Sequence, residues 1–205
     1  MRGNVIDLQV RLEEQDADQA AAGIDEAAIV ARAKAMDDDA WEYLLHSYYP
    51  RIQIYIRNRI GDHTAAEDLA SQVFEEAVVR IKNYEWRGLP FGAWLFRIAR
   101  NLSTDHLRKR QRRTGVFLQP QEQAPPGREL EQQLEAQQLR QAMQALTDEQ
   151  REVIALRFMS GLSTEDAGAI LNKSTGSVKA IQHRALRTLR RTLDQIDPAF
   201  RGERL

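Results

Sequence analysis

Apolar residues recur every three or four positions through most of the chain, a spacing that predicts a succession of helices. The pattern is clearest toward the C-terminal end. There Ser163, followed three positions later by Asp166, has the form of a helix N-terminal cap. A helix of about eight residues should follow and end at Asn172, because asparagine tolerates the left-handed backbone of a turn. Ser174 or Thr175 then caps a second, longer helix.

The longer helix is predicted to have one apolar and one basic face. Its apolar arc consists of Val178, Ile181, Ala185, Leu186, Leu189 and Leu193. The other side carries His183, Arg184, Arg187, Arg190 and Arg191. No acidic residue lies between Asp166 and Asp194, and a face of one sign favours a polyanion because solvated faces usually mix charges. Gln182 lies inside the apolar arc, and the pattern assigns it no role.

Two helices joined by a short turn are typical of a helix-turn-helix, whose second helix lies in the major groove of DNA. The basic face favours this interpretation. The alternative is a helical hairpin in a bundle, whose arginines only keep the protein soluble.

The first half of the chain predicts three further helices. The first begins near Asp25. The second follows residues 37–39 and is kinked or interrupted by Pro50. It carries the apolar stripe expected in the core: Trp41, Leu44, Leu45, Tyr48, Tyr49, Ile52, Ile54, Tyr55 and Ile56. The third covers residues 65–81 and is capped by Thr64.

The outer face of the third helix is acidic and polar. It presents Glu67, Asp68, Ser71, Gln72, Glu75 and Glu76. This face is either an ordinary solvated surface or a docking face for a basic or polar protein partner.

A long helix is predicted from Pro90 to about Arg113, with proline at its first turn. One stripe of this helix is polar or basic throughout: Arg97, Arg100, Asn101, Thr104, Asp105, Arg108 and Arg112. Basic residues bind phosphates, whereas Asn and Asp read base edges, so the stripe has the chemistry to position and to read a nucleic acid. In the preceding loop, Tyr84 and Trp86 are either core residues or stacking surfaces for unpaired bases.

The expected fold class is all-α, with two small helical domains joined by a flexible linker. The linker spans residues 114–136 and contains Pro120, Pro125, Pro126 and Gly127. It separates a domain of residues 26–113 from one of residues 137–193. Residues 1–25 form an N-terminal extension of no readable function, and residues 194–205 form a C-terminal tail. In the second domain, a helix over residues 129–146 and a helix capped by Thr147 precede the helix-turn-helix.

Charge follows this division although the formal net charge is only −1. Lys and Arg minus Asp and Glu give −7 for residues 1–50, +6 for 51–113, −4 for 114–150 and +4 for 151–205. Two basic blocks separated by an acidic one predict two nucleic-acid-binding modules on a tether.

Composition excludes several other classes. The absence of cysteine excludes disulfides and thiolate metal sites and fits a reducing cytoplasm. The chain has no secretory signal and no apolar run long enough to span a bilayer, so we expect no membrane insertion. His46, His63, His106 and His183 are scattered, and no glycine loop for phosphate is present. We therefore expect neither an enzyme nor a bound metal or cofactor.

Several segments together resemble the extracytoplasmic-function (ECF) branch of bacterial sigma factors. They are AAEDLASQVFEEAVV (65–79), PFGAWLFRIARNLSTDHLRKR (90–110), LTDEQREVIALRFMSGLSTEDAGAIL (146–171) and SVKAIQHRA (177–185). The likeness covers about residues 26–193, in the family's order and with its linker. No extra C-terminal domain is expected after it.

The resemblance implies a function for each module. Residues 26–113 would be sigma region 2, whose acidic helix docks on the clamp helices of the largest RNA polymerase subunit through Glu67, Asp68, Ser71, Gln72 and Glu75. The loop 83–89 and helix 90–113 would bind and melt the −10 promoter element and hold an extruded base. The residues implied there are Tyr84, Trp86, Arg97, Arg100, Asn101, Asp105, Arg108 and Arg112.

Residues 137–193 would be region 4, which reads the −35 element in the major groove. The residues implied in this reading are Ser177, Lys179, His183, Arg184 and Arg187. The implied partners are core RNA polymerase, including its flap region, and promoter DNA, with an anti-sigma factor as a further candidate.

The sequence departs from the family pattern at a few positions. The family often has Gln and Glu where Ser71 and Gln72 stand, Gly where Asn172 closes the turn, and Leu where Gln182 stands. The first alternative function is a stand-alone helix-turn-helix regulator, which leaves the acidic face of 65–81 and the polar stripe of 97–112 unexplained. The second is a nucleic-acid enzyme, for which the chain shows no reacting cluster.

Overall fold

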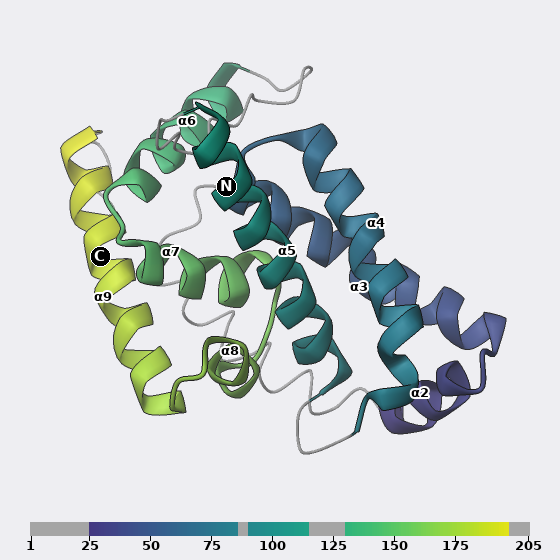
Figure 1. Cartoon of the computed structure of the whole chain (residues 1–205). Helices are drawn as coiled ribbons and strands as arrows, with labels where there is room; N and C mark the ends of the chain where they lie inside the picture. Colours follow the sequence, from purple (N-terminus) through teal and green to yellow (C-terminus); the bar gives the residue numbers. More distant parts are fainter. Residues whose placement is uncertain (1–24, 86–89, 115–129, 197–205) are drawn as a thin grey trace.

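The computed structural model describes residues 25–85, 90–114 and 130–196, and every regular element in these ranges is helical. This confirms the expected all-α class. Figure 1 shows the elements in chain order: α2(Glu26–Lys34), α3(Asp38–Ile60), α4(His63–Arg80), the 3₁₀ turn η1(Ile81–Asn83), α5(Phe91–Thr114), α6(Leu130–Gln144), α7(Asp148–Ile154), the π-helical turn η2(Ala155–Met159), α8(Thr164–Leu171) and α9(Thr175–Ile196).

Short polar side chains begin the helices, as the sequence predicts. Asp37 accepts the amide of Ala40 at the start of α3, and Ser163 accepts that of Asp166 at the start of α8. Thr147 and Gln150 form a complete capping box on α7. The start predicted for α4 was wrong, because Asp62, not Thr64, accepts the amide of Ala65 and begins the helix two residues early.

The first module consists of α2 to α5, with α5 packed against both α3 and α4. Its core contains fully buried large side chains from three helices: Ile52, Tyr55, Ile56, Val73, Phe91, Leu95 and Phe96. Helix α3 continues through Pro50, so the interruption expected there does not occur. The expected core stripe was also too broad, because Leu45 and Ile54 face solvent.

The second module consists of α6 to α9 and buries the arc predicted on α9. All six apolar residues of that arc are buried, and most of them pack with Ala142 of α6, Leu146 of the following turn and Ile154 of α7. The loop between α8 and α9 turns at Asn172, whose φ is 56°, as expected for a left-handed position. Helix α6 begins at Leu130, within the segment 114–136 expected to be linker.

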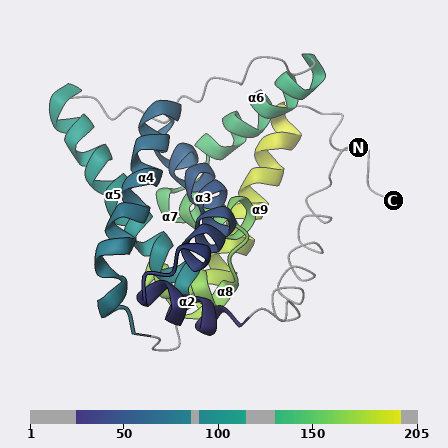
Figure 2. The same cartoon turned by 90° about the vertical axis from the view of Figure 1, so that its right-hand side faces the viewer.

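The two modules pack against each other mainly through α3 and α5 of the first and η2 and α8 of the second. Figure 1 shows α5 between the α3–α4 pair and the helices of the second module, with α4 and α9 on opposite sides, and Figure 2 shows α4 and α5 toward one side of the molecule and α6 toward the other. One cluster of buried residues contains Tyr55 and Phe96 of the first module together with Val153, Leu156 and Leu162 of the second. The modules therefore share a continuous core.

No helix in the described parts of the chain is both long enough and apolar enough to cross a bilayer.

Candidate nucleic-acid interface

The basic face of α9 is exposed along its length. The residues predicted to contact DNA there all face solvent: Ser177, Lys179, His183, Arg184 and Arg187. The buried arc on the opposite side fixes the rotation of the helix about its own axis. The structure therefore brings these five residues together on one open surface.

The turn that precedes α9 is tightly packed. A Cβ atom at Gly168 would lie 2.7 Å from the carbonyl oxygen of Lys173, so only glycine fits under this turn. Ser174 caps α9 by accepting the amide of Ser177 at 3.2 Å, which selects Ser174 from the two expected caps. Lys173 also pairs with Glu149 of α7 at 2.6 Å and so ties the turn to the rest of the module.

Gln182 has a structural role that the sequence pattern did not reveal. It accepts a hydrogen bond from Nε of Arg157 at 3.2 Å. Arg157 lies in η2 with only 3% of its surface exposed, and its Nη1 donates to the carbonyl oxygen of Leu162. A buried guanidinium needs such acceptors. The polar side chain of Gln182 within an otherwise apolar arc is therefore explained by its hydrogen bond to the buried guanidinium of Arg157 in η2.

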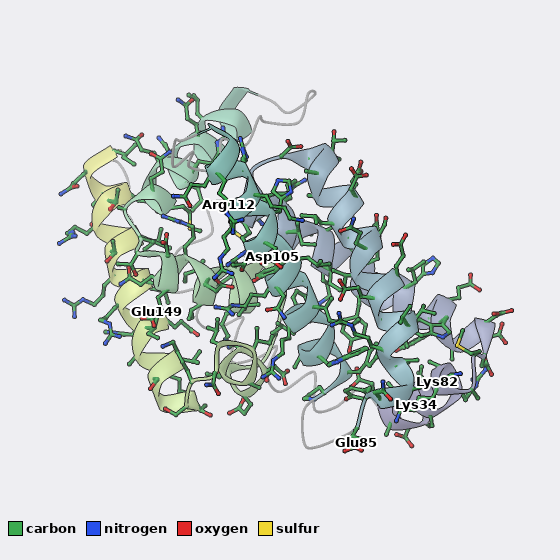
Figure 3. The ribbon with its side chains drawn as sticks, in the orientation of Figure 1. Lys34, Lys82, Glu85, Asp105, Arg112 and Glu149 are labelled. Carbon is green, nitrogen blue, oxygen red and sulfur yellow. The ribbon has the colours of Figure 1, made fainter. Side chains whose placement is uncertain are left out.

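The polar stripe of α5 divides into an open part and a part that contacts the second module. Asn101, Asp105, Arg108 and Arg112 are exposed. Figure 3 shows Asp105 and Arg112 along α5, with Glu149 of α7 on the side toward α9. The Asp105 carboxylate lies 3.6 Å from Arg108, so the open part carries both charge signs.

Two arginines of the stripe contact the second module, although Arg97 itself stays exposed. Nη2 of Arg97 donates to the carbonyl oxygen of Ala169 in α8 at 2.8 Å. Nε of Arg100 donates to the carboxylate of Glu152 in α7 at 3.2 Å. The sequence gave no signal for these contacts, because the partners lie 72 and 52 positions away along the chain.

A pocket of about 310 Å³ opens where α5, the residues after η1 and α8 meet. Its lining is Asn83, Tyr84, Glu85, Ala93, Trp94, Arg97 and Ala169. It therefore combines aromatic surface with amide and guanidinium donors.

Tyr84 is largely buried in the wall of this pocket. Its ring lies 5.0 Å from that of Trp94 and 5.6 Å from that of Phe91, and Lys34 lies over it at 5.7 Å. Burial, and then the negative charge of Glu26, raise the pKa of Tyr84 to about 12, so its hydroxyl stays protonated. Tyr84 is thus a core residue with an edge on the pocket, not an open stacking surface. Trp86 lies outside the described residues.

The acidic face predicted on α4 is also open. Glu67, Asp68, Ser71, Gln72 and Glu75 are all exposed, on the side of the helix opposite the core. Glu67 accepts from Gln53 at 3.2 Å and lies 3.6 Å from His63, whereas Glu76, at the edge of this face, pairs with Arg80.

The described residues contain no group of three or more His, Asp or Glu side chains placed to hold a metal ion.

Comparison with known proteins identifies the family. The Sigma-70 region 2 family matches residues 44–113, and the Sigma-70, region 4 family matches residues 142–191. The ECF RNA polymerase sigma factor SigD of Mycobacterium tuberculosis is 31% identical over 172 residues, which cover 80% of this chain and 81% of SigD. This chain belongs to the ECF sigma factors.

Two further relatives agree with this assignment. The ECF RNA polymerase sigma factor BldN of Streptomyces coelicolor is 37% identical over 170 residues, which cover 80% of this chain and 64% of BldN, so the chain spans just under two thirds of that relative. The solved structure of the sigma factor RpoE in complex with the anti-sigma factor NepR, from Bartonella quintana, is 30% identical and covers 75% of this chain and 96% of RpoE, with a TM-score of 0.62.

The site geometry fits the two matched regions of this sigma factor. Helix α4 and nearly all of α5 lie within region 2, α8 and most of α9 lie within region 4, and residues of both regions line the pocket. Family membership also confirms that the chain is a transcription initiation factor and not an enzyme, as expected.

Proposed function

We propose that this sigma factor acts in the cytoplasm, where it binds core RNA polymerase and directs it to promoters that carry a −10 and a −35 element. The observation that carries the proposal is that α5 and α9, on separate modules of one chain, each present exposed basic residues. Once one module has bound its promoter element, the other module is held at a high effective concentration near the second element, provided that the chain can span the distance between the two. The pair would then hold a bipartite promoter that neither module holds firmly alone.

Helix α9 would read the −35 element from the major groove. Its exposed basic residues offer charge-assisted contacts to phosphates and base edges. Ser177 and Lys179 lie near the N-terminal end of the helix, the part that meets base edges in a helix-turn-helix. Arg184 and Arg187 continue the same surface along the backbone of the duplex.

Helix α5 and the pocket would bind the opened −10 element. A pocket of about 310 Å³ has the size of a small-ligand site, and Trp94 offers a ring on which an extruded base can stack. Asn83 and Arg97 supply hydrogen-bond donors beside it. Extrusion costs a few kcal/mol of unstacking per base, which these contacts offset.

The exposed acidic face of α4 would dock on core RNA polymerase. Negative charge on that face fits a basic patch on the partner and speeds the encounter between the two. An anti-sigma factor is a further proposed partner, supported by the complex in which RpoE was solved. A stand-alone regulator would use α9 alone and leave both the face of α4 and the pocket without a role.

Base preference in a promoter screen tests the roles of α5 and α9. With core polymerase and a library randomised across both elements, Asn101→Ala should change the preferred bases of the −10 element only, because its amide reads base edges. Arg184→Ala is the control, since it lies on α9 and should affect only the −35 element. An unchanged −10 preference in Asn101→Ala would remove that residue from the reading surface.

A further inference from the structure

The contact between the two modules centres on the carboxylate of Glu152. Its side chain is 10% exposed and accepts hydrogen bonds from three side chains of the first module. The Tyr55 hydroxyl donates at 2.6 Å, Arg100 donates at 3.2 Å, and Arg59 forms an ion pair. The carboxylate of Glu152 thus joins α7 to both α3 and α5.

The Tyr55 hydroxyl and the Arg59 guanidinium are fixed as donors to Glu152. Burial, and then the neighbouring carboxylate, raise the pKa of Tyr55 well above its usual value, so the hydroxyl keeps its proton and donates. Arg59 also donates to Thr104 of α5 at 3.1 Å, which fixes the guanidinium between the two helices of its own module. The first module therefore offers a preformed anion site into which the carboxylate fits.

Two further contacts reinforce this arrangement. Arg51 of α3 donates to the carbonyl oxygens of Ser160 at 2.7 Å and Gly161 at 3.2 Å, just before the helix-turn-helix. Arg97 donates to the carbonyl oxygen of Ala169, and Ala169 forms one wall of the pocket. The second module thus contributes one residue to the pocket wall and engages two arginines of the α5 stripe.

We propose that Glu152 is an intramolecular latch, which occupies on the first module an anion site that Arg100 and Arg59 would otherwise offer to a promoter phosphate. The proposal rests on the proposed function of α5. While the latch is closed, Arg97 and Arg100 are engaged with the second module and are not available to promoter phosphates. The basic face of α9 stays exposed in the same closed arrangement, so the latch withholds these two arginines of α5 and leaves α9 open.

The latch makes a quantitative prediction for the free chain. When only the open form binds, the apparent affinity is the intrinsic affinity multiplied by the open fraction. Replacing the Glu152 carboxylate by a neutral amide should raise the open fraction of the chain about ten- to hundredfold, because hydrogen bonds to a charged acceptor are lost or weakened. Affinity of the α5 face for single-stranded DNA should then rise by the same factor until the open form predominates.

The test compares Glu152→Gln with Glu149→Gln in the full chain without polymerase. Both variants lose one negative charge on α7, but Glu149 pairs with Lys173 inside the second module and does not touch the first. Because the chain contains no cysteine, Val79→Cys and Gln195→Cys place two spin labels on exposed sites of α4 and α9. Distance distributions and binding to a fluorescent pool of random single-stranded DNA are then measured for each variant.

We expect Glu152→Gln to lengthen the distance between the labels and to tighten single-stranded DNA binding at least tenfold, with Glu149→Gln like the parent chain. Tyr55→Phe removes one donor to Glu152 while keeping the ring, so it should also lengthen the distance between the labels and tighten binding to single-stranded DNA. If Glu152→Gln does not fold, Tyr55→Phe provides the test. Unchanged distances in both variants would overturn the latch and leave the role of α5 intact. Longer distances without tighter binding would overturn the competition with DNA and would also contradict the proposed role of α5.

Discussion

At the scale of single residues, the second module depends on a polar contact inside its apolar core. Arg157 is buried, and Gln182 of α9 supplies a side-chain acceptor for its Nε. The arc on α9 was predictable because its six residues share one helix and one period. The role of Gln182 was not, because its partner lies 25 positions away and no local pattern connects the two.

Replacing Gln182 by leucine, the residue that the family often carries there, should destabilise this protein. Gln182→Leu extends the apolar arc but leaves Nε of Arg157 buried without that acceptor. We expect a loss of about 1–3 kcal/mol in the free energy of unfolding, measured by urea denaturation. Gln182→Glu, which keeps an acceptor, should retain more of the stability. Gln195→Leu, on an exposed site of α9, is the control, and equal stability in Gln182→Leu and this control would show that the contact contributes nothing.

The basic face of α9 makes a prediction about salt. Arg187→Ala should weaken binding to a duplex carrying the −35 element and lower the slope of log K against log salt by about 0.9, as expected for one lost phosphate contact. Arg80→Ala, an exposed arginine on α4, should leave both the affinity and the slope unchanged. Titration by fluorescence anisotropy at several salt concentrations measures both. An unaltered slope in Arg187→Ala would place the groove face elsewhere on the helix.

At the scale of elements, the helix boundaries follow local chemistry and were largely predictable. Ser163, Thr147 and Asn172 cap or end their helices where the sequence indicated. The start of α4 was misplaced because Asp62 and Thr64 are both good caps two positions apart, and the sequence does not rank them. Helix α3 runs through Pro50 because the buried residues on both sides of it, Leu44 and Ile52, belong to the same core.

The turn between α8 and α9 offers a matched pair of glycines. Gly168→Ala would bring a Cβ atom to 2.7 Å from the Lys173 carbonyl oxygen, and backbone cannot move aside cheaply. We expect a loss of about 1–3 kcal/mol and weaker binding to the −35 duplex, because the turn sets the position of α9. Gly176→Ala, which meets open space near the start of α9, should be neutral or slightly stabilising. Thermal unfolding of the two variants compares them directly, and equal melting temperatures would contradict this account of the turn.

At the scale of the whole molecule, the modules form one packed body with a shared core. The sequence predicted which face of each helix is buried, because the helical period shows that much. It did not predict what each face is buried against, since Glu152 meets Tyr55, Arg59 and Arg100 across separations of 97, 93 and 52 positions. The expectation of two modules on a tether therefore did not include the contact at Glu152, which we propose as a latch.

The central claim is that this chain is a promoter-specificity factor for RNA polymerase. The most direct measurement adds the purified chain to bacterial core RNA polymerase and maps the transcripts made from fragments of its own genome. The account predicts a stable complex and transcripts whose start sites align on two upstream elements, with both activities reduced by Asp68→Lys on the acidic face of α4 and unaffected by Glu165→Lys on α8. A chain that binds DNA through α9 but neither binds the core enzyme nor yields promoter-specific transcripts would contradict the claim and establish a stand-alone regulator instead.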